Sequence, residues 1–516
     1  MLTRFQLEDF RIVGHYLGLV LLLVGVSMLI PIFVAVIARE MEPLGDFILS
    51  MGITCLAGAL LVLLKFRPNQ LNGRQAILLT GLTWVFVSFF GTIPFFLSGH
   101  FSSFLNAFFE SVSAFTTTGM SILEDPNHLA YSHGIWRMMT LLMGAQGIIA
   151  FAMTIGVFAR SSGAGSLYKA EGRTDSVLPN IISTVRFSMG ITFLFVSLGA
   201  IALVFVMLFN GAHFFRAAYH AVYLSGAAFA TGGFAPMSTS IVYYHSPLLE
   251  LIIMVLMISG AINFSLYFMI WNGHFEEIFH NVEIKALVFW VIVVTIILSA
   301  AFAGDKVLGE SVGVLLRRGI FTVFAAITGA GFQIFYTSQF ADASSAAVLF
   351  AIMIAMGFGG STGSTSGGIK ALRVAIIFKS VVADIKRALA PDRAVVRVKY
   401  HHLSDRILEA NEVSSAMTVF LLYVITYLIG TMVYVFFGNS PIDAAFDSIA
   451  ATSNAGMSSG VLSPDMPALM KFTFIIQMWG GRLEFIALLA LFAGLYYTVK
   501  PVFKDGINRK KDGVRR

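Results

Sequence analysis

A short turn of small residues that ends in glycine occurs four times along this chain of 516 residues. Each turn follows a stretch of 12 to 18 residues that carries polar or charged groups, and a long apolar segment comes next. The turns read FTTTGM (115–120), FATGGF (229–234), ITGAGF (327–332) and TSNAGM (452–457), with the glycine in register at Gly119, Gly233, Gly331 and Gly456. Four such turns, at intervals of 114, 98 and 125 residues, indicate a duplicated unit.

The composition places the chain in a lipid bilayer. Hydrophobic residues make up 57% of the sequence and charged residues 12%, which leaves too little polar surface for a soluble globule of this length. A hydrocarbon core about 30 Å thick needs about 20 apolar residues per helix. Ten runs reach that length, near 12–37, 44–66, 76–97, 136–159, 187–209, 248–271, 284–303, 344–385, 413–437 and 467–498.

The stretches before the four turns are too short to cross the core at 1.5 Å per residue. They are predicted to be re-entrant half-helices, at 101–115, 214–229, 310–327 and 441–452. The order of segments predicts an all-α polytopic membrane protein, in which two leading transmembrane helices precede a fourfold pseudo-symmetric repeat of helix, re-entrant helix with loop, and helix.

The distribution of basic residues predicts the orientation. The number of runs places both termini on one side of the membrane and all four turns on the other. With both termini in the cytoplasm, 26 of the 34 Lys and Arg residues lie inside, 7 outside and 1 within a span, as the positive-inside rule requires. The net charge of +6 therefore reflects membrane topology rather than binding to nucleic acid.

The four turns predict a cation site made of backbone. Four irregular segments with few Cβ atoms, at membrane depth, can close into a ring of carbonyl oxygens that replaces the water around a cation. Glycine adopts the required backbone angles and leaves the axis free of side chains. The alternative, a packing or simple turn glycine, suits any one turn but not four in register. The predicted ion-binding residues are Thr116, Thr117, Thr118, Gly119, Ala230, Thr231, Gly232, Gly233, Thr328, Gly329, Ala330, Gly331, Ser453, Asn454, Ala455 and Gly456.

Polar side chains near the turns have two possible roles. The hydroxyls of the turns could add ligands, or they could hold the turns through backbone hydrogen bonds, and the second role is preferred for most of them. Glu110 lies nine residues before Gly119 on the first half-helix. It either holds the turn from behind or faces the outer vestibule, and the residues alone leave both open.

The eighth run contains GFGGSTGSTSGGIK at 357–370, in which six glycines and several hydroxyl residues must interrupt the helix. Irregular backbone is tolerated there only where it lines protein or a water cavity. A phosphate-binding loop is excluded because the pattern that starts at Gly363 has Ile369 where a lysine is needed. A lid beneath the ring is favoured over a packing kink. Its predicted residues are Gly359, Gly360, Ser361, Thr362, Gly363, Ser364, Thr365, Ser366, Gly367, Gly368 and Lys370.

Arg482 lies within the tenth run, where an arginine near the bilayer centre costs about 2.5 kcal/mol or more unless it faces an interior. It is predicted to be a fixed positive charge in the ion path, which either raises a barrier or pairs with carbonyls of the lid. The alternative is a salt bridge with a carboxylate such as Glu484; residues two apart on a regular helix point apart, but the neighbouring glycines indicate that the helix is broken there. His401 and His402 are predicted to be solvated in a charged loop. The single cysteine, Cys55, is predicted to be buried and inert.

Four segments carry a resemblance to a known family. ESVSAFTTTGM (110–120), SLYKAEGR (166–173), GFGGSTGSTSGGIKALR (357–373) and GRLEFIALLALF (481–492) resemble the Trk/Ktr/HKT superfamily of cation-translocating subunits, most closely the TrkH type. The likeness covers essentially the whole chain, including the two leading helices. The units it implies are 1–70 for two leading transmembrane helices, 71–175 for pore repeat 1, 176–280 for pore repeat 2, 281–408 for pore repeat 3 with an intramembrane gating loop, and 409–516 for pore repeat 4 with a basic cytosolic tail.

The resemblance implies potassium uptake across the bacterial cytoplasmic (inner) membrane through a selectivity filter. It implies a homodimer with one pore per protomer, and a cytosolic nucleotide-binding regulatory ring on the inner face. The loop at 359–368 corresponds to the gating loop of the family, and Arg482 to its pore-blocking arginine. K+ is the transported ion and no organic cofactor is expected. The implied K+ ligands are the backbone carbonyls of Thr117, Thr118, Thr231, Gly232, Gly329, Ala330, Asn454 and Ala455.

Some segments depart from the family pattern. Three segments differ from the usual sequences, namely MGAQGI (143–148), FATGGF and ITGAGF, and they leave the degree of K+ over Na+ selectivity open. Whether K+ moves in symport with H+ or Na+ is also left open by the sequence. The alternatives are a less selective Na+/K+ translocator, a cation-coupled solute carrier at broken helices, and a membrane enzyme. An enzyme is not expected, because no nucleophile with a base and no metal cluster is evident.

Overall fold

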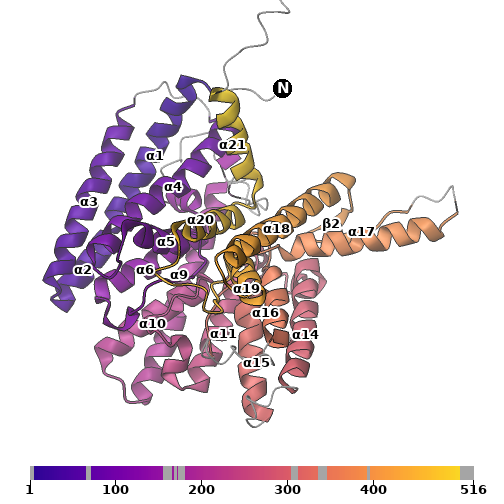
Figure 1. Cartoon of the computed structure of the whole chain (residues 1–516). Coiled ribbons are helices and arrows are strands. Elements are labelled where there is room, and N and C mark those ends of the chain that lie inside the picture. Colours follow the sequence, from indigo (N-terminus) through magenta and orange to yellow (C-terminus); the bar gives the residue numbers. More distant parts are fainter. Residues whose placement is uncertain are drawn as a thin grey trace, which may run out of the picture.

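A computed structural model describes residues 5–64, 71–154, 166–167, 171, 181–303, 312–334, 346–391 and 396–499. Most of SLYKAEGR, the basic tail from residue 500, and the first two residues of the predicted half-helix 310–327 lie outside the described residues. The described chain is mostly helical, with one short two-stranded hairpin, and its helices pack into one body (Figure 1).

The leading helices form a tight pair at one edge of the body (Figure 1). They pack closely because glycines meet at their crossing: a Cβ built on Gly18 would lie 2.6 Å from the carbonyl oxygen of Gly58. Cys55 is half-buried beside Gly25 in this pair, so the prediction that it is fully buried is wrong. The helices are α1 (Leu7–Ser27), α2 (Leu29–Ala38) and α3 (Met41–Val62).

Four sets of helices follow in chain order. The first comprises α4 (Gly73–Leu97), α5 (Phe104–Phe115), α6 (Tyr131–Gln146) and α7 (Ile148–Thr154). The second comprises α9 (Ile181–Phe209), α10 (Phe214–Phe229), α11 (Pro247–Ala261) and α12 (Phe264–Trp271). The third comprises α13 (Glu277–His280), α14 (Val282–Ala303), α15 (Val312–Ile327), α16 (Ala346–Gly357) and α17 (Ala371–Leu389). The fourth comprises α18 (Ala410–Phe436), α19 (Pro441–Thr452), α20 (Ala468–Arg482) and α21 (Ile486–Val499).

The half-helices α5, α10, α15 and α19 end where the sequence predicts. Capping side chains start two of them: the Ser103 hydroxyl accepts a hydrogen bond from the Asn106 backbone N–H, and Ser440 accepts one from Asp443, with a proline at the first helical position of α19. Each half-helix stops at a glycine turn, because the left-handed backbone there cannot continue a helix.

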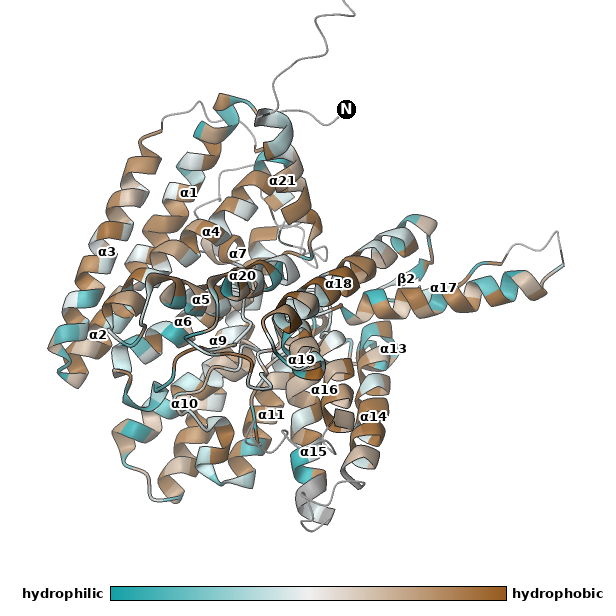
Figure 2. Ribbon diagram, viewed as in Figure 1, coloured by the Kyte–Doolittle hydropathy of each residue, from teal (hydrophilic) through white to brown (hydrophobic). Residues whose placement is uncertain are grey.

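In the part of the chain that the structure describes, six helices are long and apolar enough to cross a membrane, and eight spans result if each of two bent pairs counts as one. Large apolar side chains are exposed around the body, among them Phe33, Phe193 and Phe205, as expected of surfaces that face lipid. Figure 2 shows this apolar coat on the outer helices. The helix α17 projects away from the rest (Figure 1).

The helices that follow the turns are broken. The pair α11 and α12 is bent by 95° and the pair α20 and α21 by 112°, and α6 gives way to α7 at Gly147. The sequence indicates a break beside Arg482, where two glycines precede it. The runs 136–159 and 248–271, in contrast, are each predicted as one span, and the bends within them are not predicted.

A close approach of backbones stands just before each of these three breaks. A Cβ built on Gly144, Gly260 or Gly481 would lie 1.8, 2.1 or 1.9 Å from the last carbonyl oxygen of the half-helix in the same set. Those carbonyls belong to Phe115, Phe229 and Thr452. Only glycine lets the second helix come this close to the end of the half-helix, and the chain must then turn away to leave the crowded centre.

Small η and β elements complete the chain. Two 3-10 turns, η1 (Pro126–His128) and η2 (Ser240–Tyr244), lie after the first and second glycine turns. An antiparallel hairpin of β1 (Lys399–His401) and β2 (Asp405–Ile407) lies between α17 and α18 (Figure 1).

Candidate ion pathway

The four glycine turns adopt one backbone conformation. In each turn the glycine in register has a positive φ, between 64° and 78°, and the residue two positions earlier also has a positive φ, between 50° and 72°. Three of those earlier residues carry side chains, so the left-handed angle there is imposed by the surroundings rather than allowed by the residue. The earlier residues are Thr117, Thr231, Gly329 and Asn454.

The four turns also contact one another in a closed cycle. A Cβ built on Gly119 would lie 1.7 Å from the carbonyl oxygen of Gly232, and the same construction on Gly233 gives 2.0 Å to Ala330. On Gly331 it gives 2.2 Å to the carbonyl oxygen of Ala455, and on Gly456 it gives 2.4 Å to that of Thr118, which returns to the first turn. Each glycine therefore lies against the carbonyl that precedes the glycine of the next turn.

The four glycines line a single cavity, which is bounded by the loops that follow the turns. The cycle of contacts and the shared cavity together place the turns around one common line. Four of the eight carbonyls predicted to bind K+ take part in the contact cycle: those of Thr118, Gly232, Ala330 and Ala455.

The hydroxyls of the turns mostly fix the loops. Thr116 and Thr328 donate to backbone carbonyls one turn earlier in their half-helices, at 2.7 Å to Val112 and 2.6 Å to Phe324. Thr231 donates to its neighbour Ala230 at 2.8 Å. Other contacts join different segments: Ser453 with Tyr427, Thr118 with the Asn454 amide, and Thr117 with Arg482.

Glu110 holds the first turn from behind. Its carboxylate is fully buried and accepts hydrogen bonds from the Ser121 hydroxyl, at 2.9 Å, and from the Ile122 backbone N–H, at 3.3 Å. Arg137 forms a buried salt bridge with the same carboxylate, and its guanidinium lies 4.0 Å from the centre of the Phe234 ring. The sequence left the role of Glu110 open, and Arg137 was missed because nothing near it in the chain marks it.

The predicted lid lies directly beneath the turns. The Thr365 hydroxyl donates to the carbonyls of Gly260, at 2.8 Å, and Phe229, at 3.0 Å. A Cβ built on Gly367 would lie 2.3 Å from the carbonyl oxygen of Ser453, in the fourth turn. Ser366 closes the loop on itself by accepting from the Gly360 N–H at 2.9 Å. The loop is thus held against two different turns.

The two ends of the lid are paired to each other. Backbone hydrogen bonds of 2.9 and 3.3 Å link Gly359 with Ile369 and Ile369 with Gly357, so that the loop leaves and rejoins the helices at one point. Lys370 donates from its ammonium to the Ser366 carbonyl. Tyr423 of α18 donates to the carbonyl of Gly368 at 3.2 Å.

Arg482 joins the turns to the lid. Its guanidinium donates to the Thr117 hydroxyl at 3.1 Å, to the Thr365 carbonyl at 3.0 Å and to the Gly144 carbonyl at 2.6 Å. The predicted pairing with lid carbonyls is therefore present. The carboxylate that the alternative offered as an example, Glu484, pairs with Arg373 of α17 instead.

A small cavity borders the lid and Arg482. Its lining combines cationic and anionic side chains with lid residues: Trp84, Gly147, Glu171, Gly363, Ser364, Lys370, Arg482 and Glu484. Glu171, from the SLYKAEGR segment, also accepts hydrogen bonds from the backbone N–H groups of Ile149 and Ala150 at the start of α7.

The β hairpin is connected to the lid through Glu283, and a second glutamate, Glu277, holds the hairpin itself. Glu283, at the start of α14, accepts from the Thr362 backbone N–H at 2.8 Å and from the Thr362 hydroxyl at 2.7 Å. On its other side, its second carboxylate oxygen lies 3.9 Å from His402 Nδ1. His401 contacts Glu277 at 2.9 Å and Asp405 at 2.7 Å.

These contacts correct the prediction that both histidines are solvated: His402 is fully buried and His401 is tied to two carboxylates. The tight turn of the hairpin folds His402 inward onto α14, which no local sequence pattern indicates. Hydrogen bonds to Asp405 and Glu277 raise the pKa of His401 above its ordinary value.

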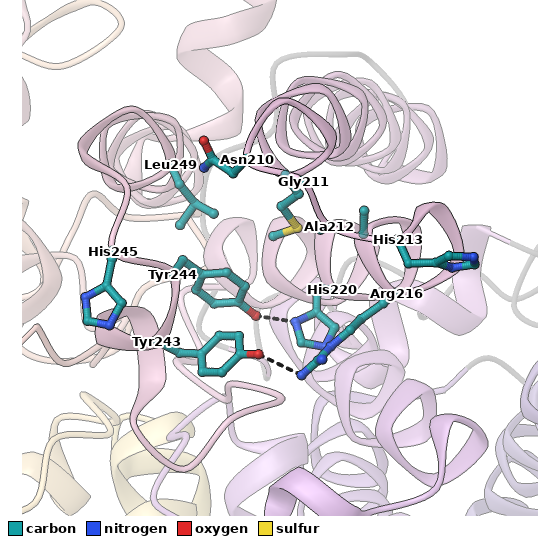
Figure 3. Close-up of a pocket in the computed structure, with 12 residues that line it drawn as sticks. Asn210, Gly211, Ala212, His213, Arg216, His220, Tyr243, Tyr244, His245 and Leu249 are labelled. Atoms are coloured by element: carbon teal, nitrogen blue, oxygen red, sulfur yellow. Dashed lines mark hydrogen bonds between the residues drawn. The ribbon is translucent and has the colours of Figure 1, made fainter.

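A further pocket lies in the second set of helices, between α9, α10 and η2. Figure 3 shows Tyr244 paired with His220, and Arg216 with Tyr243. None of the turn or lid residues lines this pocket. Among the described residues, no group of three or more His, Cys, Asp or Glu side chains could hold a metal ion.

A multi-pass helical protein in which four glycine turns surround one line, above a loop and a fixed arginine, has the architecture of a membrane transport protein for small ions. The chain belongs to the TrkH family of cation transport proteins, whose pattern matches residues 46–496. It is therefore a cation transporter and not an enzyme.

Individual relatives agree over nearly their full length. An uncharacterized cation transporter of Methanocaldococcus jannaschii is 30% identical over 98% of this chain and 99% of its own. The Trk system potassium uptake protein TrkH of Halomonas elongata is 28% identical over 94% of this chain and 99% of its own. The crystal structure of the potassium transporter TrkH from Vibrio parahaemolyticus matches with a TM-score of 0.80 over 95% of this chain and 99% of that one, at 23% identity, and so shares the fold.

Proposed function

We propose that this protein takes up potassium across the cytoplasmic membrane through a selectivity filter built from the four glycine turns. The observation that carries this proposal is the closed cycle in which each turn glycine lies against a carbonyl of the next turn. Backbone oxygens arranged around one line can replace the hydration shell of a monovalent cation. The names of the relatives, several of them potassium uptake proteins, support K+ as the cation.

The filter is proposed to comprise the sixteen residues of the turns that the sequence indicates. K+ would be held by the carbonyls of Thr117, Thr118, Thr231, Gly232, Gly329, Ala330, Asn454 and Ala455. The hydroxyls that are tied to backbone would not be ligands. They would hold the turns apart at a fixed separation, so that the carbonyls cannot close in on the smaller Na+.

The gate is proposed to comprise residues 359–368 with Lys370 and Arg482. Two observations support it: the lid is hydrogen-bonded to the second turn and packs closely against the fourth, and Arg482 bridges the first turn and the lid. A fixed guanidinium between the ring and the lid raises the energy of a cation at that point, because little water screens the repulsion there. Opening would require the loop and the arginine to move away from the line.

The wider assembly is proposed from the family resemblance. It comprises a homodimer with one pore per protomer, a cytosolic nucleotide-binding regulatory ring on the inner face, and both termini in the cytoplasm of a bacterial cell. The projecting helix α17 offers an apolar face for a second copy, with Phe378, Val381 and Ile385 exposed. The basic residues on the inner side support the orientation. Transport as symport with H+ or Na+ is part of the same proposal.

Reconstituted protein tests the transport function directly. In liposomes loaded with K+, the protein should admit external rubidium, and reversal potentials in mixed K+ and Na+ should favour K+. Equal permeability to both ions would instead identify the less selective Na+/K+ translocator. Flux that requires an organic solute would identify a cation-coupled carrier. If no alkali ion passes and the protein does not support growth of potassium-uptake-deficient cells on low K+, the proposal is wrong.

A further inference from the structure

Two of the four turns share a buried carboxylate that the other two lack. Glu110 and Asp447 each lie nine residues before the glycine of their turn, on α5 and α19, and both side chains are fully buried. At the same offset the second and third turns have Leu224 and Thr322.

The two carboxylates make the same contacts in register. Asp447 accepts hydrogen bonds from the Ser458 hydroxyl, at 3.0 Å, and from the Ser459 backbone N–H, at 2.7 Å. These residues are two and three positions after Gly456, as Ser121 and Ile122 are after Gly119. In both turns the half-helix that precedes the glycine is therefore hydrogen-bonded to the extended segment that follows the glycine.

The second and third turns cannot form this tie. Leu224 has no acceptor, and the Thr322 hydroxyl donates to the Arg318 carbonyl of its own helix at 2.8 Å. The residue two positions after the glycine is Ala235 in the second turn and Gln333 in the third, so the serine hydroxyl is missing as well. The first and fourth turns are neighbours in the ring, since Gly456 lies against Thr118. One half of the ring is thus braced by carboxylates and the other half is not.

The two braces differ in charge. Arg137 neutralises Glu110 and also donates to the Tyr223 hydroxyl of the second set at 3.1 Å. Among the described residues, no Lys, Arg or His forms a salt bridge with Asp447. Its acceptor oxygens accept from the Ser458 hydroxyl and the Ser459 backbone N–H, which are both uncharged donors.

We propose that Glu110 and Asp447 are specificity-determining positioning residues. They set the width of the ring by fixing the segments that follow the glycines of the first and fourth turns. This inference rests on the proposed filter. A carboxylate that accepts two hydrogen bonds from one segment limits the movement of that segment more than packing alone does. The carbonyls of the first and fourth turns would then keep the separation that suits K+ even when the second and third turns move.

Asp447→Ala is the principal test, with reversal potentials of reconstituted protein in mixed K+ and Na+ as the readout. Loss of two charge-assisted hydrogen bonds should raise the sodium-to-potassium permeability ratio by about threefold to tenfold. Asp447→Asn keeps an acceptor for Ser459 and a group that can pair with Ser458, and should restore the parent ratio. Thr322→Ala, at the same offset in the third turn, is the matched control and should leave the ratio unchanged.

Two further variants keep the inference testable if Asp447→Ala does not fold. Ser458→Ala removes only the hydroxyl contact and should raise the ratio by a smaller factor. Glu110→Gln leaves Arg137 uncompensated and should weaken K+ uptake at low K+. Adding Arg137→Met should recover the uptake with the parent ratio, because the Gln side chain still accepts from the Ile122 N–H.

The inference would be overturned if Asp447→Ala and Ser458→Ala both kept the sodium-to-potassium permeability ratio of the parent. It would also be overturned if Thr322→Ala changed that ratio as much as Asp447→Ala does. Neither outcome would affect the proposal of K+ transport. Parent protein that passes no alkali ion would instead remove the proposed function itself.

Discussion

On the outer side of the glycine ring, four turns present the same backbone conformation, whereas on the inner side one loop and one arginine occur in single copies. The positive φ values repeat in all four turns, at two positions each. The lid comes only from the third set of helices, and Arg482 only from the fourth. We infer that the fourfold repeat is kept where an ion must be coordinated from all sides. It is absent where conduction must be controlled, because one loop and one side chain are enough to block a single ion path.

The largest expected effect tests the outer side. Gly119→Ala places a Cβ 1.7 Å from the Gly232 carbonyl oxygen, so the neighbouring turn must move. Overpacking of about 3 kcal/mol would lower rubidium uptake by about a hundredfold. Gly99→Ala is the matched control, since Gly99 has a similar φ of 72° but open space around it. It should cost about 1 kcal/mol of stability and leave uptake at the parent level. Parent uptake in Gly119→Ala would contradict the contact cycle.

The next effect tests the inner side. Arg482→Ala removes the charge and its hydrogen bonds to Thr117, Thr365 and Gly144. Rubidium flux should rise by about tenfold, because a unit charge in a poorly screened path contributes more than about 1.4 kcal/mol to the barrier. Arg482→Lys keeps the charge and should stay near the parent flux. Unchanged flux in the alanine variant would remove Arg482 from the gate, and a rise in the lysine variant would show that hydrogen bonds, rather than charge, close the path.

A smaller effect is expected where the lid meets α14. Glu283→Ala removes the acceptor of two hydrogen bonds from Thr362 and should raise rubidium flux by about threefold, in line with the usual contribution of such bonds. Thr362→Val removes only the hydroxyl and should have less effect than Glu283→Ala. If both variants conduct like the parent, the anchoring of the lid to α14 has no part in closing the path.

The smallest effect concerns pH at the hairpin. The pKa of His401 is raised above its ordinary value of 6.5, first by the hydrogen bond to Asp405 and then by the one to Glu277. A raised folded-state pKa means that this stabilisation is fully present below about pH 6.5 and is lost as the pH rises through the folded value. Hydrogen exchange of residues 399–407 should therefore accelerate with pH beyond its intrinsic dependence. His401→Gln should abolish that excess, and persistence of the excess in this variant would exclude His401 as its source.

Much of this arrangement could be predicted from the sequence because backbone requirements are local. A glycine that must take a positive φ, preceded by a half-helix too short to span the core, is visible in the residues themselves, and the ends of α10 and α19 agree with the predicted stretches. The lid could be recognised for the same reason, since six glycines within fourteen residues cannot continue a helix.

The side-chain partners were harder to predict because they come from distant parts of the chain. Arg137 forms a salt bridge with Glu110, and Arg373, rather than Arg482, forms one with Glu484. His402 is buried against α14. Asp447 is the exception: aligning the four turns on their glycines would have revealed it at the same offset as Glu110.

By itself, the sequence determined the bilayer environment, the half-helices, the glycine positions and the break at the lid, since each follows from hydrophobic length or from backbone angles that only glycine adopts freely. Tertiary structure alone decided the bends after α6 and α11, the cycle of turn contacts and the pairing of the buried charges. The physical reason is that a buried charge takes whichever partner the packing of distant helices brings within reach, and nothing in the residues next to it specifies that partner.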